Sequence, residues 1–173
     1  MDPKPISKNS IPRALEKAER YRLLNEPGEA QSICRDVLQA DPGNQRALVM
    51  MLLATTDQFG RDPAAGIAQA REVLAEVTDP YEAAYYTGVM CERWAKSRLR
   101  LEPAGRVALG WLKEAIEWFE KAEPLRPSGN DDTLLRWNAC ARLLQRHEAA
   151  SRSGPSGPSG PDTLTHDDDV PPR

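Results

Sequence analysis

The sequence predicts an all-α protein with about seven helices. From Ile11 onward, helix-length segments with apolar residues at helical spacing alternate with short segments rich in proline, glycine and aspartate. No segment shows the strict alternation and the β-branched enrichment that are typical of a strand. A pattern shared by two distant stretches of the chain indicates, in addition, that the helices are arranged as a repeat.

The shared pattern is clearest in Gly110–Pro127 and returns in Gly28–Pro42. Each stretch has a small residue, a larger residue four positions later and a proline eight positions after that. Residues at such spacing share one packing face of a helix, and the proline then ends the helix. The residues are Ala115, Phe119 and Pro127 in the later stretch, and Ala30, Cys34 and Pro42 in the earlier one.

The first two helices are predicted from their spacing and their ends. The first begins beside Pro12, because a proline is accepted in the first turn, where its missing N–H needs no partner. Its apolar side chains recur at helical spacing as far as Leu24, before the break at Pro27. The second helix is expected over residues 29–40 and ends at the turn around Pro42.

The third helix is expected over residues 45–58 and is apolar on most sides. This composition is typical of a helix that packs against neighbours from two directions. The last helix follows Asp131 and Asp132, either of which suits the N-cap position. The remaining helices are expected over residues 66–77, 81–102, a segment that contains Gly110–Pro127, and 133–148.

Several residues stand at the spacing of a known repeat: Tyr21, Ala30 and Pro42 in a first unit, and Gly88, Ala115, Phe119 and Pro127 in a third. Through them the chain resembles the tetratricopeptide repeat (TPR) family, whose pattern of about 34 residues runs W-x2-L-G-x2-Y, then A-x3-F, then P. Cys34 replaces the aromatic residue of the first unit. The resemblance covers about residues 11–147 and implies a right-handed superhelical stack of three antiparallel helical hairpins plus a lone final helix.

The third hairpin, about residues 81–126, is expected to be elongated. Relative to the usual period it has about 13 extra residues between Trp94 and Trp111. The simpler interpretation is that both helices are longer and protrude, with three arginines keeping the tip soluble. The alternative is that this tip is a lateral contact site.

Composition divides the chain into three parts: a flexible N-terminus (1–10), the helical repeat domain (11–150) and a disordered tail (151–173) rich in serine, glycine and proline. The net charge is −3, of which the tail contributes −2, from four aspartates against Arg152 and Arg173. No basic field remains for a nucleic acid, and no apolar run suits a signal peptide or a membrane span. We therefore expect a soluble, cytoplasmic protein that binds neither nucleic acid nor membrane.

The sequence contains no pattern that indicates an enzyme. Cys34, Cys91 and Cys140 lie far apart inside apolar helical patterns, as expected for buried thiols in a reducing compartment. A capping role suits His147. The glutamates that recur every three residues from Glu114 to Glu123 have Lys113 and Lys121 among them, as on a solvated helix face. We expect no catalytic residue, no cofactor and no metal site.

The TPR resemblance implies a concave groove that binds an extended or helical peptide of a partner protein. The positions that in one version of the family grip a C-terminal carboxylate are here Leu15, Glu19, Met50, Glu82 and Tyr86, so that grip is not expected. Helical spacing places other residues on stripes of the third, fifth and seventh helices, with apolar and aromatic side chains beside charged ones. The residues predicted to bind a partner are Val49, Leu53, Thr56, Tyr85, Val89, Glu92, Arg93 and Trp137.

Two alternatives stay open at this point. The predicted stripe can belong to the core, with Trp137 capping the stack against the third unit. The protein can also be a structural subunit that associates with itself, or joins a larger complex, through exposed helical faces.

Overall fold

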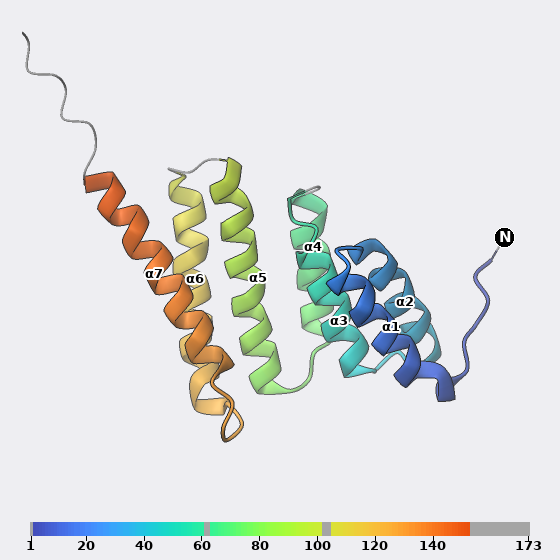
Figure 1. Cartoon of the computed structure of the whole chain (residues 1–173). Helices are drawn as coiled ribbons and strands as arrows, with labels where there is room; N and C mark the ends of the chain where they lie inside the picture. Colours follow the sequence, from blue (N-terminus) through green and yellow to red (C-terminus); the bar gives the residue numbers. More distant parts are fainter. Residues whose placement is uncertain (1, 61–62, 102–104, 153–173) are drawn as a thin grey trace, which may run out of the picture.

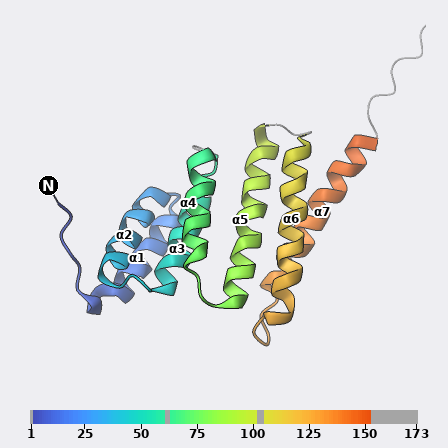
Figure 2. The same ribbon diagram turned by 180° about the vertical axis from the view of Figure 1, so that it is seen from behind.

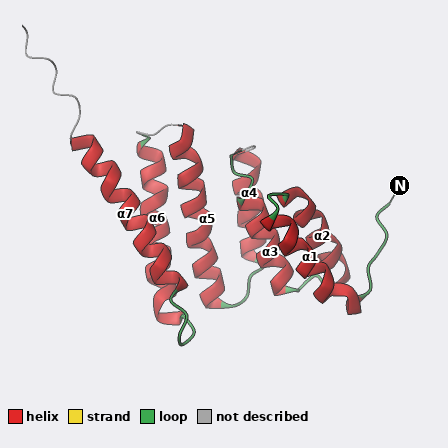
Figure 3. Ribbon diagram, viewed as in Figure 1, coloured by secondary structure: helices red, strands yellow, loops and turns green. Residues whose placement is uncertain are grey.

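A computed structural model of the chain describes residues 2–60, 63–101 and 105–152 (Figure 1). Throughout these ranges the regular structure is helical and no strand is present (Figure 3), which confirms the all-α fold class. Two short 3-10 helices, η1 (Lys8–Ser10) and η2 (Glu123–Leu125), accompany the α-helices. The α-helices are α1 (Ile11–Leu23), α2 (Pro27–Ala40), α3 (Gln45–Thr56), α4 (Pro63–Ala75), α5 (Pro80–Leu101), α6 (Arg106–Ala122) and α7 (Asp132–Arg152).

The helices form a row with α1 near one end and α7 at the other (Figure 1). Each helix packs against the next along the chain, and α1 also contacts α3, α3 contacts α5 and α5 contacts α7. Figure 1 shows α1, α3 and α7 in front of α2, α4 and α6, and Figure 2, from behind, shows the opposite order. We call the side formed by α1, α3, α5 and α7 the odd-helix face.

The predicted helix ends differ from the structure by a few residues. α2 begins at Pro27 rather than Glu29, because a proline fits the first turn of a helix. α4 covers Pro63–Ala75 instead of 66–77, and the chain tightens at its end, where the Val77 N–H donates to the Leu74 carbonyl at 3.1 Å. At the other end of the chain, α7 continues to Arg152.

The third hairpin is longer than the first two. α5 has 22 residues and α6 has 17, whereas α1 to α4 have 12 to 14 each. α5 and α6 also share the most extensive contact between any two helices of the described chain. Residues 102–104 at the hairpin tip, and residues 153–173 of the predicted tail, lie outside the described residues.

The core follows the row of helices in three clusters. The largest lies between α3 and α7 and includes Phe59, Trp94, Leu112 and Phe119. Two smaller clusters join α1, α2 and α3. Phe119 is fully buried, as the repeated pattern predicts for its larger residue, and Cys34 occupies the matching buried position on α2.

Gly88 is the residue that lets α5 and α6 approach so closely. A Cβ atom on Gly88 would lie 2.6 Å from Cε1 of Phe119, which is far inside van der Waals contact. The glycine therefore receives the aromatic ring of the facing helix. This contact joins two of the residues on which the repeat resemblance rests.

Candidate partner-binding face

The residues predicted to bind a partner lie on α3, α5 and α7, three of the helices of the odd-helix face. How much of each side chain remains accessible depends on how these helices are held together. Two polar networks hold them, one centred on Asp57 and the other on Glu92.

Asp57 ties three helices together. It follows the last residue of α3, and its carboxylate accepts hydrogen bonds from Arg22 of α1 and from Arg93 of α5. The distances are 2.8 Å from Arg22 Nε to Oδ2 and 2.6 Å from Arg93 Nη1 to Oδ1. One carboxylate therefore fixes the spacing of α1, α3 and α5 along the odd-helix face.

Arg93 makes further contacts with the end of α3. Its Nη1 donates to Thr56 Oγ1 at 2.6 Å and to the Leu53 carbonyl oxygen at 3.1 Å. Both acceptors lie in the last turn of α3, where the helix dipole favours a cation. Burial lowers the pKa of Arg93, and Asp57 counteracts this by stabilising the charged form.

Glu92 joins α5 to α7. Its side chain is only 3% exposed, and its carboxylate accepts hydrogen bonds from Arg136 Nη1 at 2.8 Å and from Lys96 Nζ at 2.5 Å. Arg136 also donates from Nε to the Tyr85 hydroxyl at 2.9 Å and lies over the Tyr85 ring. Burial by itself would lower the pKa of Arg136, but Glu92, with a further contribution from Tyr85, raises it above the ordinary value.

Because Arg93 and Glu92 are neighbours on α5, the two networks together form a polar chain across α1, α3, α5 and α7. Of the residues predicted to bind a partner, Leu53, Thr56 and Arg93 meet in direct hydrogen bonds. Tyr85 and Glu92 are joined through Arg136, which donates to both. Val49 has no part in the polar chain.

The predicted residues fall into two groups by exposure. Thr56, Val89 and Glu92 are 4%, 1% and 3% exposed, so they have almost no surface to offer a partner. Their contacts are made within the protein. The residues that remain partly exposed are Val49, Leu53, Tyr85, Arg93 and Trp137.

Trp137 packs partly against the central core. Its indole Nε1 donates to Glu120 Oε1 on α6 at 3.1 Å. A half-buried indole with its N–H satisfied by the preceding helix is well suited to hold α7 on α6. Trp137 therefore has a packing role, and the rest of its ring surface remains accessible.

Arg22, Asp57, Lys96 and Arg136 belong to the networks but are not predicted from the sequence. Each is a charged residue on or beside a helix, and nothing in its local spacing distinguishes it from a solvated charge. Their partners lie from four to 51 residues away in the chain. Apart from the pair of Lys96 with Glu92, which lie one turn apart on α5, only the packing of the helices reveals the network.

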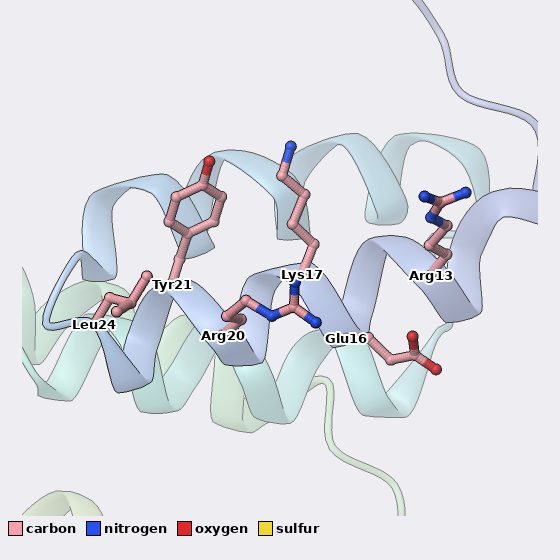
Figure 4. A pocket seen from close by; sticks show the side chains of 6 residues that line it. All are labelled: Arg13, Glu16, Lys17, Arg20, Tyr21 and Leu24. Atoms are coloured by element: carbon pink, nitrogen blue, oxygen red, sulfur yellow. The ribbon is translucent and has the colours of Figure 1, made fainter.

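The surface of the described chain includes at least three hollows. One, of about 480 Å³, lies between α5 and α7, and one of about 250 Å³ adjoins it beside the end of α3. The third, of about 540 Å³, is lined by side chains of α1 and of Leu24, which directly follows it (Figure 4), with Lys17 placed over the ring of Tyr21. None of the predicted partner-binding residues lines this third hollow, whereas Thr56 and Arg93 line the second.

The three cysteine thiols, which are potential nucleophiles, are packed in the protein core. Cys34, Cys91 and Cys140 are fully buried, and burial raises the pKa of each thiol to about 12. Among the described residues, no three His, Cys, Asp or Glu side chains are grouped so that they could hold a metal ion. Within the same ranges, no helix has the length and apolar character needed to cross a membrane.

Comparison with known proteins identifies no relative: no family model, no curated protein and no solved structure matches the chain significantly.

Proposed function

We propose that the protein is a TPR-like interaction module that binds a peptide or a helix of a partner protein on its odd-helix face. Support for the family comes from the packing of Gly88 against Phe119, which stand at the glycine and phenylalanine positions of the TPR pattern. The contacts of α1 with α3, of α3 with α5 and of α5 with α7 agree with a superhelical stack of hairpins. Three buried thiols agree with a cytoplasmic location.

The observation that carries the proposal is a set of partly exposed apolar side chains beside a fixed polar chain. Leu53, Tyr85 and Trp137 keep accessible surface on α3, α5 and α7, although each also packs against the central core. The Asp57 and Glu92 networks hold these three helices in place. A rigid face with aromatic anchors and charged neighbours has the composition at which binding energy concentrates, and its rigidity lowers the entropic cost of binding.

Val49→Asp is the sharpest test, because Val49 is half-buried and belongs to none of the three core clusters. The partner is captured from the native cytoplasm with the full chain and then purified, and its affinity is measured by calorimetry. We expect Val49→Asp to weaken binding at least about tenfold, or 1.4 kcal/mol, with an unchanged unfolding midpoint. Val107→Asp is the matched control, because Val107 is 71% exposed on α6. Equal losses in both variants would contradict binding at the odd-helix face.

A second candidate function is that of a structural subunit, and exposed leucines at the two ends of the row favour it. Leu23 is 83% exposed on α1, and Leu135 is 64% exposed on α7. Apolar side chains on both terminal helices suit end-to-end association. The mass in dilute solution tests this candidate: a stable dimer that Leu23→Asp or Leu135→Asp dissociates would favour it over a monomeric binding module.

A further inference from the structure

Two pairs of basic side chains face one another across the groove between α5 and α7. Lys96 and Arg100 lie one turn apart on α5, and Arg142 and Arg146 lie one turn apart on α7. All four line the hollow of about 480 Å³, whose apolar lining is formed by Leu99, Ala139 and Leu143. We call this hollow the basic groove.

The charge of the basic groove is largely uncompensated. Lys96 is paired with Glu92, but Arg100, Arg142 and Arg146 have no ion-pair partner among the described residues. Like charges one turn apart on a helix destabilise it, and here two such pairs share one groove. An anionic segment between them would remove both repulsions.

The adjoining hollow extends the basic surface toward α3. It shares Lys96 and Arg100 with the basic groove and adds Arg93. Its one acidic residue, Asp57, is already paired with Arg22 and Arg93. The region therefore presents several cations, with no spare carboxylate in its lining.

The C-terminal segment of the same chain has the complementary composition. It contains Asp162 and the run Asp167–Asp169, together four carboxylates. From Arg152, the last residue of α7, Asp167 is 15 residues away, so the connecting chain can span up to about 50 Å. Arg142 lies ten residues back along α7, or about 15 Å. The carboxylates are covalently within reach of the basic groove.

We propose that the segment 162–169 of the chain itself occupies the basic groove, with its carboxylates paired to Arg100, Arg142 and Arg146. A tethered ligand is present at an effective concentration of the order of mM, which a separate molecule seldom reaches. The proposal goes beyond the function proposed above and does not depend on it. Where both hold, the segment competes with a partner for the α5 and α7 end of the odd-helix face.

Paramagnetic broadening in the full-length chain tests this occupant. Thr165→Cys carries the nitroxide label, and the three native thiols stay unlabelled because they are fully buried. At about 10 mM salt, where the Debye length is about 30 Å, we expect loss of the amide signals of Lys96, Arg100 and residues 139–146. At about 1 M salt, where that length is about 3 Å, the signals should return.

Two disrupting variants and one matched control complete the test. Changing all four aspartates of the segment to asparagine should abolish the broadening, as should Arg142→Gln with Arg146→Gln. Arg13→Gln with Arg20→Gln removes the same charge from exposed positions on α1, and should leave the broadening unchanged. Broadening that persists in the asparagine variant, or that centres on α1, would overturn the proposal. So would broadening of an isotope-labelled chain by an added spin-labelled chain, because the occupant would then be a second copy.

Discussion

At the scale of single residues, Gly88 and Phe119 set the distance between α5 and α6. Three atoms of the Phe119 ring lie within 3.0 Å of the place where a Cβ on Gly88 would be. Gly110, on α6, faces open space by the same criterion. The two glycines therefore have opposite roles, although both lie inside helices.

Gly88→Ala should destabilise the protein by about 1–3 kcal/mol, because the added methyl group meets the buried ring and either the ring or the helix must shift. Where a helix has room for the added methyl group, replacing glycine by alanine stabilises the protein by about 0.5–1 kcal/mol, and we expect that result for Gly110→Ala. Urea denaturation of both variants gives the comparison. A stabilising Gly88→Ala would mean that the two helices do not approach as closely as described.

Phe119→Ala should cost about 3–5 kcal/mol, because it removes a fully buried ring from the central core. In that background the cost of Gly88→Ala should largely vanish, which a double-mutant cycle measures. Glu120→Ala is the neighbouring control and should cost well under about 1 kcal/mol, because Glu120 is exposed and its hydrogen bond from Trp137 lies at the surface. Additive effects of Gly88→Ala and Phe119→Ala would contradict their direct contact.

The three buried thiols predict a pH dependence of stability. Burial raises the pKa of Cys34, Cys91 and Cys140 in the folded state to about 12, whereas an unfolded thiol ionises near about 8.5. A raised pKa in the folded state contributes stability that is fully present below the unfolded value and is lost as the pH rises toward the folded value. Stability should therefore fall between about pH 9 and 12, and less steeply in Cys34→Ala, as urea titrations at several pH values can measure.

At the scale of elements, the polar networks decide how the odd-numbered helices sit side by side. Glu92 is the most buried charge in them, and it joins α5 to α7 through Arg136. A buried carboxylate that loses its partners is strongly destabilising, so this pair holds α7 in one position. The packing of Trp137 against α6 fixes the same helix from another side.

Glu92→Gln should destabilise the protein by about 1–3 kcal/mol, because Arg136 then loses its carboxylate partner in a half-buried position. Glu117→Gln removes the same charge from an exposed position on α6 and should change stability by less than about 0.5 kcal/mol. Thermal unfolding of both variants makes the comparison. If the two variants unfold at the same temperature, the Glu92–Arg136 pair does not hold α7.

Periodicity alone was enough to predict which segments are helical and where the repeated pattern packs. Phe119 and Cys34 lie in the core because their spacing from other apolar residues follows the period of a helix, and that period is visible in the sequence. The first residues of α2 and α4 were predicted too late in the chain, because a proline is compatible both with a break between helices and with a first helical turn.

The candidate face was only partly predictable for a physical reason. Thr56, Val89 and Glu92 share helix stripes with exposed residues, but their burial depends on which neighbouring helix covers them. Arg22 and Asp57 meet across 35 residues of sequence, and their pairing depends on the position of α1 relative to α3. A single sequence contains no local signal for such a contact.

At the scale of the whole molecule, the row of helices has two sides with different chemistry. The odd-helix face holds the polar chain and the partly exposed Leu53, Tyr85 and Trp137. The opposite side is formed by α2, α4 and α6 (Figure 2). α6 carries the exposed Glu114 and Glu117. A partner that recognises the molecule through the odd-helix face leaves the α2, α4 and α6 side free.

Hydrogen exchange of the full chain, with and without its captured and purified partner, tests the central claim most directly. We expect added protection in α3, α5 and α7, and no change in α2, α4 and α6. The same experiment with Val49→Asp should lose the added protection, whereas Val107→Asp should keep it. Added protection confined to the amides of α2, α4 and α6 would contradict binding at the odd-helix face. So would added protection confined to the amides around Leu23 of α1 and Leu135 of α7.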